Sequence, residues 1–155
     1  MIDLVFKNYT SQKAPGDKFF RLILEIGIKK LKIKNKNIEL SLSLVGEAKI
    51  RELNKRYRGK DAATDVLSFP LEESRLQRYD ILPLGDIFIC LPFVVKESKR
   101  QNISIEKELA RLTVHGFLHL LGYDHPDDEV SGPRLKRRGE KMLGIENKIL
   151  KDLKL

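Results

Sequence analysis

All three histidines of this 155-residue chain fall within one window, residues 115–125, and their spacing constrains the fold around them. His115 and His119 are four residues apart, so on a helix their imidazoles share one face, about one turn apart. Gly122 can end such a helix in a left-handed conformation, and the chain can then fold back to bring His125 to the same point. Three neutral imidazoles around a divalent ion leave a fourth position for water, as in catalytic zinc sites. The window therefore predicts one metal ion per chain, bound by His115, His119 and His125; imidazole also suits copper, nickel and iron, and zinc is the preferred metal.

The order of the predicted elements indicates an α+β protein, in which a small mixed sheet of about four strands packs with helices. Alternating or continuous apolar residues predict strands over residues 2–6, 38–45, 65–70 and 84–90. Apolar residues at helical spacing predict helices over residues 15–31, 46–57 and 93–100, and a further helix from residue 104 through the histidine window. Residues 128–142 and 145–154 are predicted to form one or two closing helices. The charge-rich stretch 71–83 is predicted to be irregular. The helix that carries the histidines is predicted to be a zincin-like metal helix.

We predict a single domain over residues 1–155, because the chain is long enough for one core and contains no internal repeat, linker or low-complexity tract. No apolar run approaches the ~20 residues that span a bilayer, and the N-terminal residues lack the pattern of a signal peptide. We therefore expect no membrane association. The single cysteine, Cys90, lies in an apolar run and is predicted to be buried, and the expected location is the reducing cytoplasm.

The net charge of +8 has two interpretations, solvated lysine-rich faces or a polyanionic partner such as nucleic acid. Three basic residues, Arg56, Arg58 and Lys60, follow one another where a predicted helix gives way to a loop. Arginine or lysine typically balances the negative charge of the transition state in phosphodiester cleavage. Arg58 is the preferred candidate for this catalytic and substrate-binding role, and Lys60 is a weaker substrate-binding candidate. The alternative for Arg58 is a solvated charge at a helix end.

The histidine spacing also matches the metzincin zinc proteases, with one informative departure. In that class a glutamate follows the first histidine and deprotonates the zinc-bound water, whereas Gly116 stands at that position here. Peptide hydrolysis by the usual route is therefore not favoured, although zinc held by three histidines can still activate water near neutral pH. Asp124 has two interpretations, a carboxylate that orients a ligand imidazole or a turn residue.

Three segments together resemble the motifs of the YbeY family of bacterial endoribonucleases, also called rRNA maturation factors. The first is the histidine window, which reads His115-Gly116-Phe117-Leu118-His119-Leu120-Leu121-Gly122-Tyr123-Asp124-His125. The second runs from Asn54 to Asp61 and continues as Thr64-Asp65-Val66-Leu67-Ser68-Phe69-Pro70, and the third is Leu84-Gly85-Asp86-Ile87. Their order and spacing fit the family, and the resemblance covers most of residues 38–125.

The resemblance implies a single-domain α+β fold, in which His115, His119 and His125 bind zinc and Arg58 is the family's important arginine. It implies cleavage of single-stranded RNA, with ribosomal RNA and the ribosome as partners, and no DNA is expected. The implied setting is maturation of the small-subunit rRNA 3′ end and ribosome quality control. Two alternatives remain open: a metallopeptidase-like hydrolase, which would need a replacement carboxylate from Asp124 or Asp65, and a non-enzymatic ribosome-binding module with zinc as a structural pin.

Overall fold

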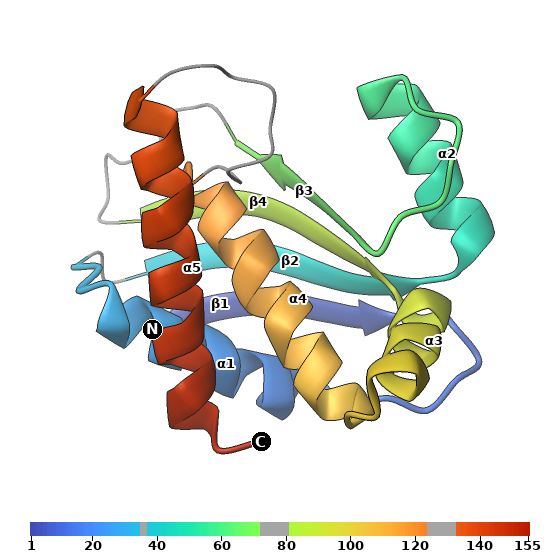
Figure 1. Cartoon of the computed structure of the whole chain (residues 1–155), viewed down its shortest axis with the longest axis horizontal. Helices are drawn as coiled ribbons and strands as arrows, with labels where there is room; N and C mark the ends of the chain where they lie inside the picture. The colour runs from blue at the N-terminus through green and yellow to red at the C-terminus, as the bar shows by residue number, and fades with distance from the viewer. Residues whose placement is uncertain (35–36, 72–80, 124–132) are drawn as a thin grey trace.

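The computed structural model describes residues 1–34, 37–71, 81–123 and 133–155, with side chains left out for residues 133–140. Figure 1 shows how these segments are arranged. In chain order the elements are β1 (Ile2–Asn8), α1 (Asp17–Lys30), β2 (Asn37–Val45), α2 (Glu47–Arg58), β3 (Val66–Pro70), β4 (Ile81–Cys90), α3 (Leu91–Gln101), α4 (Ile105–Leu120) and α5 (Pro133–Leu153). The predicted α+β class is confirmed.

The four strands form one mixed sheet in the order β1-β2-β4-β3. β1 pairs with β2 and β2 pairs with β4 in parallel, whereas β3 pairs with β4 antiparallel. Parallel neighbours need a crossover connection, and α1 provides it between β1 and β2. β3 lies at one edge of the sheet, so the second motif segment ends at an edge strand. The predicted small mixed sheet is confirmed.

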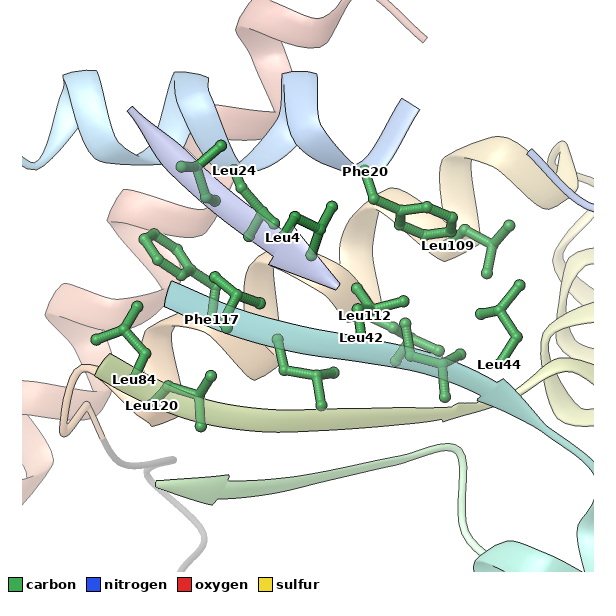
Figure 2. Packing of buried hydrophobic residues seen from close by; sticks show 14 of the residues in the cluster. Leu4, Phe20, Leu24, Leu42, Leu44, Leu84, Leu109, Leu112, Phe117 and Leu120 are labelled. Carbon is green, nitrogen blue, oxygen red and sulfur yellow. The ribbon is translucent and has the colours of Figure 1, made fainter. Parts of the chain in front are cut away.

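The two faces of the sheet are covered by different helices. On one face, the apolar residues of β2 that alternate with polar ones are buried and pack with side chains of α1 and α4; they are Ile38, Leu40, Leu42 and Leu44. Figure 2 shows the labelled side chains of these elements pointing toward one another. On the other face, Ile50 and Leu53 of α2 pack against Val45, Leu67 and Cys90. Cys90 is buried as predicted, and its burial raises the pKa of the thiol. In Figure 1, α2 accordingly lies apart from the neighbouring helices α4 and α5.

β4 begins earlier than the sequence patterns predict. Residues 71–83 are predicted to be irregular, but β4 starts at Ile81 and pairs at once with the first residues of β2. The prediction was wrong here because pairing with a neighbouring strand outweighs the local breaker signal of Pro83. Residues 72–80 lie outside the described part of the chain.

The closing segment is predicted as one or two helices, and where it is described it is the single helix α5 (Pro133–Leu153). Residues 128–132 of the predicted closing helix lie outside the described residues. Among the helices in the described ranges, none combines the length and the apolar character that a bilayer crossing requires.

Gly85 of β4 allows a close approach between β4 and β3. Its φ of +128° lies in a region that other residues rarely adopt, and a Cβ atom there would lie 2.1 Å from the carbonyl oxygen of Phe69 in β3. Register shifts by one residue just before it, between Glu39 and Leu40 of β2. Gly85 therefore fixes the position of β3 relative to β4.

Replacing Gly85 by alanine is expected to lower the free energy of unfolding by at least about 2 kcal/mol, because both the backbone strain and the clash with Phe69 must be relieved. Urea unfolding of Gly85→Ala measures this loss. Gly46→Ala is the matched control, since φ at Gly46 is −86° and a Cβ atom there meets nothing within 4 Å. Equal stabilities of the two variants would contradict the proposed role of Gly85.

Candidate functional site

Helix α4 forms where the sequence predicts it and carries the two described histidines. The Ser104 hydroxyl caps its first turn by accepting a hydrogen bond from the backbone N–H of Lys107 at 3.1 Å. Leu109, Leu112 and Phe117 are buried against the sheet side of the core. After Leu120 the chain turns through Gly122, whose φ of +92° agrees with the predicted change of direction.

His115 and His119 lie side by side on α4, with their Nε2 atoms 3.0 Å apart. Their ring centroids are 4.5 Å apart, and the rings are inclined at 74°. Two imidazole nitrogens bound to one tetrahedral zinc ion at about 2.0–2.1 Å lie roughly 3.3 Å apart. The Nε2–Nε2 distance of 3.0 Å is close to this separation. The pair therefore fits a metal ion bound through Nε2.

The other predicted residues of the metal site, Asp124 and His125, lie outside the described residues. Within the described ranges, no group of three histidine, cysteine, aspartate or glutamate side chains is placed to hold a metal ion. The structure thus shows two of the three predicted ligands, and the roles of His125 as a ligand and of Asp124 as an orienting carboxylate remain predictions.

Glu146 of α5 faces His115 of this pair and was not singled out from the sequence. Its Oε2 atom lies 3.7 Å from Nδ1 of His115, and only 8% of the Glu146 side chain is exposed. The sequence offered one weak signal, an acidic residue between the apolar positions Ile145 and Ile149 of an amphipathic helix. Nothing in a local pattern relates α5 to α4, so the contact is visible only in the folded chain.

A second ion pair lies on α4 next to the histidines. Glu108 is 1% exposed and accepts two hydrogen bonds from Arg111, at 2.6 Å from Nη2 and 3.1 Å from Nε. These bonds raise the pKa of Arg111, and the carboxylates of Asp65 and Glu146 add to the effect. Asp65 lies 4.0 Å from Arg111, just before β3. Arg111 precedes His115 by one helical turn, so a fixed positive charge adjoins the histidine face.

Gly116 brings α4 directly onto the sheet. A Cβ atom at this position would lie 3.0 Å from Cγ2 of Ile87 in β4 and 3.1 Å from Oγ of Ser68 in β3. The Ser68 hydroxyl donates to the carbonyl oxygen of Gly116 at 3.3 Å. The position that carries the catalytic glutamate in metzincins is therefore packed against two strands here, and a longer side chain would displace α4.

Arg58 reaches the same strand from the other side. Gly59, with φ of +69°, ends α2 in a left-handed conformation, and the backbone N–H groups of Gly59 and Lys60 bond to carbonyl oxygens of the last turn. The Nη2 atom of Arg58 donates to the carbonyl oxygen of Ser68 at 3.2 Å. Ser68 thus contacts Arg58 through its backbone and Gly116 through its side chain. The structure links Arg58 to the helix segment that carries the histidines through one residue of the edge strand.

The family model described as Endoribonuclease YbeY matches residues 6–154, which is nearly the whole chain. The chain belongs to the YbeY family.

Individual YbeY relatives agree with this assignment. Endoribonuclease YbeY of Pseudomonas entomophila is 39% identical over 153 residues, which cover 99% of this chain and 90% of the relative. Endoribonuclease YbeY of Sulfurihydrogenibium sp. is 43% identical over 112 residues, covering 72% of this chain and 71% of the relative. The solution structure of TM1509 from Thermotoga maritima shares the fold with a TM-score of 0.54 at 29% identity, covering 94% of this chain and 89% of that one.

The segment that resembles the second YbeY motif contains structural as well as exposed residues. The buried amide of Asn54 donates to the carbonyl oxygen of Ala62 at 2.9 Å and so holds the loop after α2. Asp61 accepts a hydrogen bond from Arg51 at 2.8 Å, which lowers the pKa of Asp61. Arg58 and Lys60 are exposed. The loop therefore presents these two cations on a fixed backbone.

Tyr57 continues the face of α2 formed by Ile50 and Leu53, as the helical spacing predicts. Ile50 and Leu53 are buried, whereas Tyr57 is 59% exposed. It lies at the last turn of α2, where its ring contacts Phe69 at a centroid distance of 5.3 Å. The last turn of α2 thus contacts β3 but leaves much of the Tyr57 ring on the surface.

Replacing Gly116 by alanine tests the close packing of α4 on the sheet. Alanine in a helix interior normally adds about 1 kcal/mol of stability relative to glycine. In Gly144→Ala this gain is expected, because Gly144 of α5 has nothing within 4 Å of the added Cβ atom. In Gly116→Ala the contacts with Ile87 and Ser68 are expected to remove the gain and destabilise the protein by about 1 kcal/mol or more. Chemical unfolding of the two variants measures the difference, and an equal stabilisation in both would contradict this account.

Proposed function

We propose that this chain is a zinc-dependent endoribonuclease that hydrolyses phosphodiesters of single-stranded RNA. The observation that carries the proposal is the convergence of the Nε2 atoms of His115 and His119 at 3.0 Å, within a chain of the Endoribonuclease YbeY family. His125 is the proposed third ligand, with one zinc ion per chain. Zinc held by three histidines would supply an activated water for hydrolysis near neutral pH.

Arg58 would bind the substrate beside this site. Its guanidinium has five N–H donors in a planar fork suited to a phosphate, and the bond to Ser68 uses one of them. That bond fixes the side chain at the edge of β3 before RNA arrives. We propose that the remaining donors hold a non-bridging phosphate oxygen as negative charge develops on it. Lys60, two residues further along the exposed loop, would add positive charge for the neighbouring phosphate.

A preference for single strands follows from the burial of the site. The His115 side chain is 15% exposed and lies between α4 and α5. A flexible strand can bring one phosphate to such a position, whereas a rigid duplex presents its phosphates on a wide convex surface. With the net charge of +8, this favours RNA that offers unpaired segments. We further propose ribosomal RNA and the ribosome as partners, 3′-end maturation of the small-subunit rRNA and ribosome quality control as the setting, and the cytoplasm as the location.

Removal of the metal and loss of one ligand are expected to have the same effect on cleavage. Dialysis against a chelator is expected to abolish cleavage of a single-stranded RNA, and added zinc is expected to restore it. His119→Ala is expected to be inactive with zinc present, since two ligands do not hold the ion. Circular dichroism before and after chelation checks the fold.

Full RNA cleavage by the metal-free protein would contradict the proposal, and unfolding on chelation would favour the alternative in which zinc is a structural pin. Cleavage of a peptide but not of RNA would favour the metallopeptidase-like alternative.

Loss of Arg58 is expected to slow the chemical step more than it weakens RNA binding. We expect Arg58→Ala to lower the single-turnover rate at saturating RNA by about 100-fold. Arg56→Ala is the matched control, because it removes the same charge from the same helix end, where Arg56 lies over the Tyr57 ring. The control is expected to weaken binding at low salt while leaving the saturated rate nearly unchanged. Equal rates for the two variants would contradict the role of Arg58.

A further inference from the structure

Glu146 is a buried carboxylate that approaches the histidine pair from a different helix. Its side chain is 92% buried, and its Oε2 atom lies 3.7 Å from Nδ1 of His115. Burying a carboxylate is costly unless charge or hydrogen bonding compensates for it. The nearby compensation comes from His115 and from Arg111, whose pKa is raised in part by Glu146. Packing alone would favour an apolar residue at this buried position. The carboxylate found there instead points at an imidazole of the proposed metal site.

The geometry separates Glu146 from the ligands themselves. His115 presents Nε2 to Nε2 of His119, whereas Glu146 lies at Nδ1, on the other side of the same ring. A group at Nδ1 cannot also bind an ion held at Nε2 of that ring, because the two nitrogens point in widely different directions. Glu146 is thus placed to act on the imidazole, not on the ion.

We propose that Glu146 is a positioning residue that accepts a hydrogen bond from the Nδ1–H group of His115 and so keeps the Nε2 lone pair directed toward the metal. The inference rests on the proposed zinc site. Metal-binding histidines commonly donate their second N–H to a carboxylate, which fixes the tautomer and strengthens the ligand. The 3.7 Å separation is within ion-pair range but longer than a hydrogen bond, so the two atoms must approach by about 1 Å when the site is loaded.

The experiment compares Glu146→Ala and Glu146→Gln with the wild-type chain. Zinc affinity is measured by competition with a chromophoric chelator, and the tautomer of His115 in the metal-free protein is measured by nitrogen-15 NMR. The glutamine variant keeps an acceptor oxygen without the charge. Ile149→Ala is the control, because Ile149 is fully buried on the same helix and packs near Gly27 of α1, one turn beyond Glu146. Thermal unfolding of each metal-free variant monitors the fold.

We expect Glu146→Ala to weaken zinc binding by 10- to 100-fold and Glu146→Gln to weaken it less. We expect the Nδ1–H form of His115 to lose population in the alanine variant. The control is expected to lower the unfolding temperature while keeping the zinc affinity and the tautomer. Wild-type zinc affinity and an unchanged tautomer in Glu146→Ala would overturn the inference and leave the proposed function standing. Failure of the wild-type chain to bind zinc would instead count against the proposed function, and the tautomer measurement would still decide the role of Glu146.

Discussion

The direct contact between α4 and the sheet at Gly116 sets the position of the residues proposed to form the site. With no side chain at that position, the helix packs on Ile87 and receives a hydrogen bond from Ser68 of the edge strand. The neighbouring residue, His115, is then turned away from the core toward α5, with His119 one turn further along the same face. A longer side chain at residue 116 would lift the helix and separate the histidines from the strand that Arg58 contacts.

The edge strand β3 connects the two halves of the site. Gly85 sets its position against β4, and Ser68 in its middle contacts Arg58 on one side and α4 on the other. The Arg58 guanidinium and the imidazoles of His115 and His119 are thereby held by rigid elements instead of long loops. This arrangement suits catalysis by electrostatic stabilisation, which requires groups that are already in place before the substrate binds.

The sequence predicted those features that depend on local periodicity. The shared face of His115 and His119 follows from the helical repeat, and the alternation in β2 predicted its buried face correctly. The features that sequence patterns missed depend on contacts between distant segments. The early start of β4 comes from pairing with β2, and the approach of Glu146 comes from the packing of α5 on α4. From the sequence, Gly116 is seen to stand where metzincins carry their catalytic glutamate. That Gly116 also lets α4 pack closely on the sheet is seen only from the positions of Ile87 and Ser68 in the fold.

The most direct test of the central claim is anomalous scattering at the zinc edge from crystals of the zinc-loaded protein. The account predicts one strong peak per chain, within about 2.0–2.1 Å of both Nε2 atoms of His115 and His119. A peak bound through Nδ1 of His115, or no peak between the two rings in protein that contains zinc, would contradict it.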